Sequence, residues 1–193
     1  MKDGRDRLLR ASLDLFTERG FHAVSIRDIA DRAGLTNPAL YQHFAGKAEL
    51  GEALYLSCYE RLIAAVEARL TAQMSPLDRL AAYVRASVDL HAERPSPLPF
   101  LEDHQRLFGR EALAQYGDRA VSNRLTAWVR EGQRAGEIRS DIPTSFLVGL
   151  CIGQLTKWIM MSEMDLAPRD QAAEHLIALL MTALTPPIPP SES

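Results

Sequence analysis

The sequence has little cysteine, few aromatic residues and no strong excess of charge. Only two cysteines occur in 193 residues, Cys58 and Cys151, and they lie far apart rather than in a Cys-x-x-Cys pair. This spacing is typical of thiols in a reducing compartment, and it argues against a disulfide framework or a cysteine-based zinc site. A formal net charge of -3 argues against a protein that coats nucleic acid, because such proteins are usually strongly basic.

No hydrophobic run is long enough to predict a membrane-spanning helix. The most apolar segment, 146–161, is shorter than the roughly 18 residues that such a helix needs, and Gln154 and Lys157 interrupt it. We therefore expect a buried helix at this position and no membrane partner. Segment 1–10 is charged and lacks the apolar stretch of a secretory signal, so we expect a cytoplasmic protein.

The alternation typical of β-strands is also missing, and apolar residues recur at helical spacing instead. This pattern predicts an all-α fold of about nine helices. We expect a first helix that ends near residue 20, followed by two short helices, one over 25–34 and one that begins at 36. Longer helices are expected over 47–71, 75–93, 118–135, 141–164 and 168–184, and shorter helical pieces within 100–116. Asp141 and Pro168 are expected to begin the last two, while Pro95, Pro97 and Pro99 predict a loop.

Local signals define two short helices near the N-terminus. Ser25 and Asp28 form a capping box, in which the serine accepts a backbone N–H and the aspartate reaches back. Gly34 is expected to end this helix in the left-handed conformation. Thr36 then caps the next helix, with Pro38 in its first turn, where a missing N–H costs no hydrogen bond.

Two short helices joined by a glycine-containing turn and preceded by a longer helix form a helix-turn-helix, which is a DNA-binding arrangement. Ser25 and the N-terminus of the helix that follows it offer N–H groups and a positive dipole to a DNA phosphate. Hydroxyl, imidazole and ammonium groups suited to the DNA backbone are supplied by Thr36, Tyr41, His43 and Lys47. Asn37 can pair with adenine, and Pro38 and Ala39 offer a small apolar surface to a thymine methyl group. Three apolar residues should face the core and hold the second helix in place: Leu35, Leu40 and Phe44.

At these residues the sequence resembles the N-terminal signature of TetR-type (TetR/AcrR) transcriptional repressors. The resemblance rests on Ala-Gly-Leu-Thr, Ala-Leu-Tyr-Gln-His-Phe and Lys-Ala-Glu-Leu, which occur in order and at the family's spacing within residues 21–50. It implies phosphate contacts by Tyr41, His43 and Lys47 and base contacts by Arg27, Asn37 and Ala39. Asn37-Pro38 departs from the basic residue and glycine that many members have there, and Gly46 replaces the usual serine or asparagine.

Beyond residue 50 the resemblance extends only to length, helix count and the turn at 136–141. It implies a homodimer that binds a small-molecule effector between helices and dimerises through its last two helices. The candidate pocket residues are His91, Phe100, His104, Phe108, Trp128 and Trp158, although aromatic residues at helical spacing more often belong to the core. The candidate interface residues are Phe146, Gly149, Leu150, Gly153, Leu176 and Leu180, with burial inside the chain as the alternative. One recognition helix reads too few base pairs, which favours the dimer.

We therefore expect a helix-turn-helix DNA-binding domain over 1–46, a helical ligand-binding and dimerisation domain over 47–185, and a flexible tail over 186–193. The predicted function is repression at an operator in double-stranded DNA, with release by the effector. The fourth helix, which runs from Lys47 into the second domain, is expected to transmit the conformational change from the effector to the DNA-binding domain. A transcriptional activator or an effector-independent regulator is the alternative.

A metal-dependent enzyme is the remote alternative. His91-Ala-Glu93 matches the start of a zinc-deaminase pattern, but no Pro-Cys-x-x-Cys follows. Glu102, Asp103 and His104 could ligate a metal, yet adjacent helical residues point in different directions. No nucleophile elbow, Walker loop or dinucleotide fingerprint occurs. We predict no enzymatic activity, no catalytic residues and no metal or cofactor.

Overall fold

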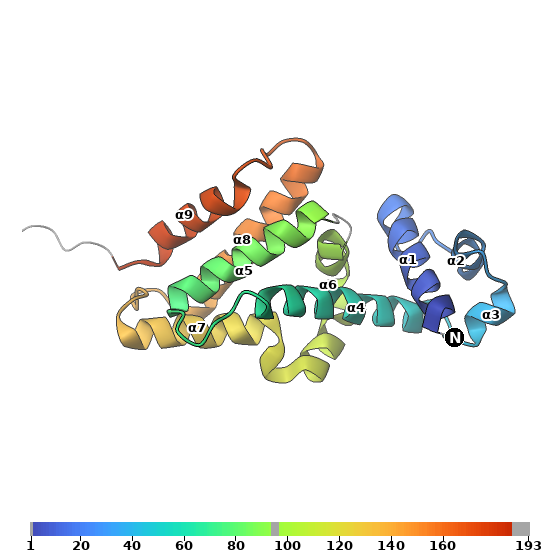
Figure 1. Ribbon diagram of the computed structural model, residues 1–193, viewed down its shortest axis with the longest axis horizontal. Helices are drawn as coiled ribbons and strands as arrows, with labels where there is room; N and C mark the ends of the chain where they lie inside the picture. Colours follow the sequence, from blue (N-terminus) through green and yellow to red (C-terminus); the bar gives the residue numbers. More distant parts are fainter. Residues whose placement is uncertain (1, 94–96, 187–193) are drawn as a thin grey trace, which may run out of the picture. The chain divides into compact units, whose positions relative to one another are not determined.

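The computed structural model describes residues 2–93 and 97–186 (Figure 1). Within these ranges every regular element is helical, which confirms the all-α fold class. The elements are α1 (Lys2–Arg19), α2 (Ile26–Ala33), α3 (Asn37–Tyr41), α4 (Lys47–Glu67), α5 (Pro76–Glu93), α6 (Pro97–Tyr116), the short 3-10 helix η1 (Gly117–Arg119), α7 (Val121–Ala135), α8 (Thr144–Glu163) and α9 (Ala172–Leu184). Pro95 and all but the first residue of the expected tail over 186–193 lie outside the described residues.

The described residues form two compact units. The first consists of those within Met1–Arg61 and Arg94–Gln115, and the second of those within Leu62–Glu93 and Tyr116–Ser193. The first unit therefore contains α6 together with α1, α2, α3 and most of α4. Aromatic contacts hold α6 there, because Phe100 stacks on Phe16 at 6.0 Å between ring centroids and Phe108 meets Phe21 at 5.8 Å. The functional division at residue 46 stays a prediction.

The second unit is a bundle of α5, α7, α8 and α9 that also contains the end of α4. Helix α5 packs against α7, α8 and α9, and Figure 1 shows it lying beside them. Its Leu80 and Val84 are fully buried, as is Leu125 of α7. A fully buried leucine stabilises a fold by about 1.5–3 kcal/mol through removal of apolar surface from water. Burial also raises the pKa of the Cys151 thiol in α8 to about 12, so this thiol is protonated and unreactive at neutral pH.

Helix α6 differs from the expectation of a proline-rich loop followed by short pieces. It is one continuous helix of 20 residues, and it begins at Pro97 with Pro99 in its first turn. The first N–H groups of a helix have no intrahelical partner, so proline loses nothing there. The expectation of a loop at Pro97 and Pro99 is therefore wrong, because both prolines lie in the first turn of α6. Helix α4 ends at Glu67 rather than near residue 71, and the expected helix over 118–135 begins as η1 followed by α7.

The starts of α8 and α9 also differ from the expectation. Asp141 does not cap α8, since its carboxylate accepts two hydrogen bonds from Arg139, at 2.8 and 2.6 Å. Helix α8 instead starts at Thr144. Pro168 lies before α9, and its carbonyl accepts a hydrogen bond from Trp158 Nε1 at 3.1 Å. Helix α9 starts at Ala172.

Helix α8 corrects the expectation of a buried helix around the apolar segment 146–161. Among the described residues it is the one helix long and apolar enough to cross a membrane, with 20 residues and only 28% of its most apolar window buried. One such helix is weak evidence for a membrane, because a core helix of a soluble protein passes the same test of length and composition. The low burial leaves an apolar face uncovered within the single chain.

Candidate DNA-binding site

The capping box before α2 forms as the sequence predicts. Ser25 Oγ accepts a hydrogen bond from the backbone N–H of Asp28 at 3.2 Å, and Asp28 Oδ2 accepts one from the backbone N–H of Ser25 at 2.8 Å. The Ser25 hydroxyl also donates to the same carboxylate. These donors hold the pKa of the Asp28 carboxyl below its ordinary value, so the cap is charged at neutral pH. The Ser25 hydroxyl hydrogen and the N–H groups of Ser25 and Asp28 are thus used within the cap, which leaves the N–H groups of Ile26 and Arg27 as the predicted phosphate donors.

The turn between α2 and α3 depends on a left-handed glycine. Gly34 has φ 64°, and its N–H and that of Leu35 return to the carbonyls of α2. A Cβ at Gly34 would lie 2.8 Å from Arg7 Nη2. Arg7 donates to the carbonyls of Gly34, at 3.2 Å, and of Ala33, so its guanidinium satisfies the C-terminus of α2. Sequence reasoning missed Arg7, because its partners lie 26 and 27 residues away.

Helix α3 is short, and its two faces differ sharply. Leu40 is fully buried and Phe44, just beyond the helix, is 2% exposed, as expected of side chains that hold α3 in place. Leu35 is only half-buried. On the other face Tyr41 is 55% exposed. The predicted DNA-facing residues Thr36 and Asn37 are exposed, and Ala39 is half-buried, with its N–H capped by Thr36 Oγ1 at 3.3 Å.

Lys47 has a different environment from the other predicted phosphate contacts. Its Nζ donates to the carbonyls of Phe21 at 3.0 Å, His22 at 3.3 Å and Val24 at 2.9 Å. The ammonium also lies over the Phe21 ring, 4.8 Å from its centroid. An ammonium has three N–H donors, so all three can be used by the segment between α1 and α2. Lys47 joins the start of α4 to that segment.

His43 and Arg27 differ in their freedom to reach DNA. The His43 ring packs on α1 at Gly4, where a Cβ would lie 3.0 Å from His43 Nε2. Glycine at this position therefore makes room for the imidazole, which is half-buried. The Arg27 side chain is 82% exposed and lies 3.8 Å from Asp31, one helical turn away. Such an exposed pair contributes little to stability, so Arg27 can reorient toward a ligand at small cost.

The six predicted pocket residues are divided between the two units. Phe100, His104 and Phe108 lie in the first unit, where His104 stacks on Phe100 at 4.4 Å and bonds its carbonyl through Nδ1 at 2.9 Å. They pack with Phe21 in the core of that unit. His91, Trp128 and Trp158 lie in the second unit.

In the second unit, His91 and Trp158 lie against each other, 5.5 Å between ring centroids. The Ser162 hydroxyl donates to the Ile159 carbonyl, so its oxygen accepts from the Nε2–H of His91 at 3.2 Å. Trp128 lines a separate crevice. These contacts do not test whether His91, Trp128 or Trp158 contacts an effector, so each of these roles stays a prediction.

The predicted dimer residues divide into exposed and buried groups. On α8, Phe146 is 72% exposed and Leu150 39% exposed, and a Cβ at Gly149 or Gly153 would meet no atom of the chain. On α9, Leu176 and Leu180 are buried within the single chain, as in the alternative of burial inside the chain, and their interface role stays a prediction. The apolar face of α9 that points outward carries Leu179, which is 66% exposed.

Comparison with known proteins agrees with this architecture. The sequence profile described as bacterial regulatory proteins, tetR family, matches residues 8–54. The HTH-type transcriptional repressor KstR2 of Mycobacterium tuberculosis is 31% identical over 142 residues, which cover 72% of this chain and 70% of that protein. The chain belongs to the TetR family of transcriptional regulators. It is therefore a regulator that binds DNA through the helix-turn-helix of α2 and α3.

Two further similarities extend this result. The HTH-type transcriptional activator FasR of Mycolicibacterium smegmatis is 40% identical over 85 residues, which cover 44% of this chain but only 39% of that protein. The crystal structure of the regulator FadR from Bacillus subtilis, in complex with stearoyl-CoA, has a TM-score of 0.76 at 17% identity and covers 92% of this chain and 97% of that one. The latter similarity shows a shared fold.

Proposed function

We propose that this TetR-family regulator represses transcription by binding a palindromic operator as a homodimer, and that a small-molecule effector releases it. The observation that carries the proposal is α3, a five-residue helix fixed by buried Leu40 and presenting exposed Tyr41 on its other face. An exposed tyrosine on a helix that is otherwise held rigidly has little value for stability. It is well placed to contact DNA.

The proposed DNA contacts follow from the chemistry of groups that are exposed or half-buried. Thr36, Tyr41 and His43 contact phosphates together with the N–H groups at the start of α2, while Asn37, Ala39 and Arg27 contact bases. Lys47 supports this surface by fixing the segment before α2, because its donors are directed to carbonyls of that segment. The DNA-binding function is assigned to residues 1–46, and ligand binding and dimerisation to residues 47–185.

Dimerisation accounts for the uncovered apolar face of α8. Phe146, Leu150 and Met160 recur along this face at helical spacing, and the two glycines between them allow close approach of a second helix. A second copy of the chain would cover these residues and the exposed Leu179 of α9. Two recognition helices about 34–36 Å apart then meet successive major grooves.

Effector binding acts through differential affinity for two conformations of the dimer. The effector binds in the second unit and favours the conformation whose recognition helices no longer match the operator half-sites. Helix α4 transmits the change, since it begins in the DNA-binding unit and ends in the other. The stearoyl-CoA complex of FadR supports a ligand-responsive role. The protein acts in the cytoplasm on DNA and performs no catalytic step.

The test is selection of bound sequences from a random duplex library with the full chain, followed by binding measurements on the selected site. We expect an inverted repeat, bound by a dimer and lost in Tyr41→Ala. A matched control is Tyr59→Phe, an aromatic change outside α2 and α3. If no sequence is selected, or if Tyr41→Ala binds as tightly as the parent, the proposal is wrong.

Activation of transcription is the second candidate. It is favoured by one observation, the 40% identity to the activator FasR over 85 residues. Reporter expression from the selected operator separates the two functions: deletion of the regulator raises expression if it represses and lowers expression if it activates.

A further inference from the structure

The start of α1 lies beside the end of α3 in the first unit (Figure 1), and two side-chain contacts hold it there. A Cβ at Gly4 would lie 3.0 Å from Nε2 of His43, so the missing side chain at Gly4 lets the imidazole pack against α1. The Arg5 guanidinium lies over the Phe44 ring, with its Cζ atom 5.3 Å from the ring centroid. The first turn of α1 is therefore packed against the segment that directly continues α3.

Arg5 lies on the face of α1 that packs into the unit, at the end where the buried residues of that face stop. Leu8, Leu9 and Ser12 follow it by three, four and seven residues, which places them on the same face of the helix. All three are buried, whereas Arg5 is exposed. The backbone of α1 thus directs the Arg5 side chain along the edge of the packed face, toward the segment after α3.

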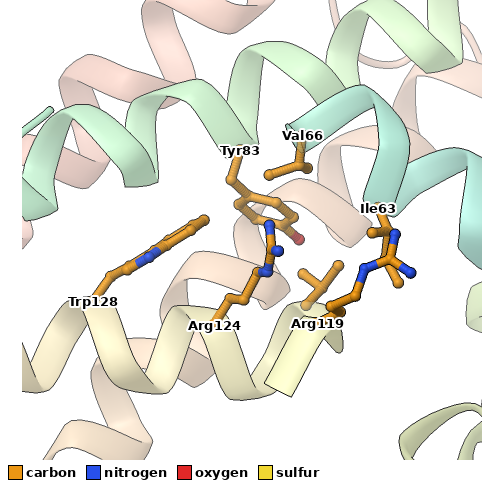
Figure 2. A pocket seen from close by; sticks show the side chains of 7 residues that line it. Ile63, Val66, Tyr83, Arg119, Arg124 and Trp128 are labelled. Atoms are coloured by element: carbon orange, nitrogen blue, oxygen red, sulfur yellow. The ribbon is translucent and has the colours of Figure 1, made fainter. Parts of the chain in front are cut away.

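Other arginines are bound within the fold, and Arg5 differs from them. Arg119 and Arg124 of the second unit, shown in Figure 2, both donate to the Glu67 carboxylate, through their Nη2 atoms at 3.1 and 2.7 Å. Within residues 2–93 and 97–186, no carboxylate forms an ion pair with Arg5. The Phe44 ring attracts the charge of Arg5 but supplies no oxygen for its five N–H donors.

This cation lies next to a predicted phosphate contact. The His43 ring packs at Gly4, so the imidazole and the Arg5 guanidinium lie at the same end of α1. Asp3 and Asp6 are also exposed there, but each residue of a helix is turned by about 100° from the one before it, which places both on other faces of α1. A guanidinium that rests on a ring is ordered, and its N–H groups suit two-point binding of a phosphate.

We propose that Arg5 is a DNA contact outside the helix-turn-helix: its guanidinium, oriented by the Phe44 ring, binds a phosphate beside those that Tyr41 and His43 are predicted to contact. The inference rests on the proposed operator binding and adds a residue of α1 to that surface. A phosphate contact carries no sequence information, so Arg5 raises the affinity for every duplex and the operator sequence is read without it. Because Phe44 is buried beneath α3, the guanidinium is positioned together with the recognition helix.

The test compares Arg5→Met, which keeps an unbranched side chain over the Phe44 ring and removes the charge, with Arg5→Lys, which keeps the charge. Fluorescence anisotropy with the full chain gives the affinity as a function of salt, for the selected operator and for a duplex of mixed sequence. We expect Arg5→Met to weaken binding to both duplexes about tenfold or more. The slope of log affinity against log salt should fall by about 0.9 for each Arg5 in the complex.

Two variants serve as references for that slope. Arg5→Lys should keep the slope of the parent protein, because an ammonium also neutralises a phosphate. The matched control is Arg10→Met, which removes an exposed cation from another face of the same helix and should change neither affinity nor slope. An unchanged slope in Arg5→Met would overturn the inference.

Melting temperatures and a second selection separate a DNA contact from other roles of Arg5. A cation over an exposed ring edge contributes little to stability, so Arg5→Met should lower the melting temperature by no more than about 4 °C. Weaker DNA binding that only follows a larger loss of stability, with the parent's slope, would show a structural role and overturn the inference. Selection with Arg5→Met should return the same inverted repeat as the parent, and loss of a preferred base would overturn a contact to phosphate alone.

The duplex of mixed sequence separates this inference from the proposed function. If the parent protein selects no operator, the proposed function is wrong, and the mixed-sequence duplex still shows whether Arg5 contacts phosphate. If an operator is selected and its binding is lost in Tyr41→Ala, while Arg5→Met binds both duplexes as the parent does, the inference about Arg5 is wrong and the proposed function stands.

Discussion

Replacing Lys47 by methionine tests whether this residue fixes the DNA-binding unit or contacts phosphate. The change keeps most of the aliphatic stem and removes the ammonium. It leaves three backbone carbonyls without their donor, those of Phe21, His22 and Val24, and removes the cation from the Phe21 ring. If Lys47 served only to contact phosphate, its replacement would not affect these carbonyls in the free protein.

The magnitude can be worked from these contacts. A hydrogen bond to a charged group contributes about 1.5–3 kcal/mol, but the three bonds share one half-exposed ammonium and water can reach part of the segment. We therefore expect Lys47→Met to lower the free energy of unfolding by about 2–3 kcal/mol. For a chain of this size the melting temperature should fall by about 5–10 °C. Lys47→Arg should recover part of the loss, since its guanidinium can also donate to carbonyls.

Calorimetry gives the stability, and fluorescence anisotropy on the selected operator gives the affinity as a function of salt. Each phosphate contact adds about 0.9 to the slope of log affinity against log salt. We expect weaker binding at every salt concentration with an unchanged slope, measured well below the melting temperature. Arg10→Met removes an exposed cation of the same unit and is the stability control. A slope reduced by about 0.9 per site, with the melting temperature unchanged, would refute the reasoning.

Three further changes have defined outcomes. Gly34→Ala should destabilise by about 1–3 kcal/mol in chemical unfolding, because its φ of 64° and the nearby Arg7 both oppose a Cβ. Arg119 and Arg124 hold the pKa of the Glu67 carboxyl below its ordinary value. The stabilisation that the Glu67 carboxylate contributes is therefore present at neutral pH and is lost as pH falls through the lowered pKa. We expect the melting temperatures of Glu67→Gln and the parent protein to converge in acid. Phe146→Glu should yield monomers in sedimentation at concentrations where the parent is dimeric, with helix content retained.

The sequence predicted the parts of the fold that depend on near neighbours. Ser25 and Asp28 are three residues apart and form the cap as expected, and Gly34 adopts the left-handed turn for which only its own backbone matters. Asp141 failed as a cap because Arg139, two residues away, competes for the same carboxylate. A local pattern shows that an aspartate can cap, and it does not show which of two nearby donors the side chain will bind.

The roles of residues in the candidate site were harder to predict where they depend on partners that lie far away in the sequence. Lys47 stands at the family's position for a phosphate contact, but its carbonyl partners lie 23–26 residues earlier in the chain. Leu176 and Leu180 belong to the same apolar helix as Leu179, and only the packing of α9 separates buried from exposed faces. The predicted pocket aromatics are likewise divided between the units, with Phe100 in the first and Trp128 in the second, and their role as effector contacts stays a prediction.

The fixed cations of the first unit also bear on how the protein binds DNA. Lys47 is directed to carbonyls, Arg7 satisfies the end of α2, and Arg32 forms a two-point bridge to Glu18 at 3.0 and 2.9 Å. These three charges stabilise the unit and are poorly available for phosphates. The remaining surface of α3 is neutral, with Asn37 and Pro38 exposed at its start. Operator affinity must then depend more on directed hydrogen bonds than on counterion release, and its dependence on salt should be shallow for a dimeric repressor.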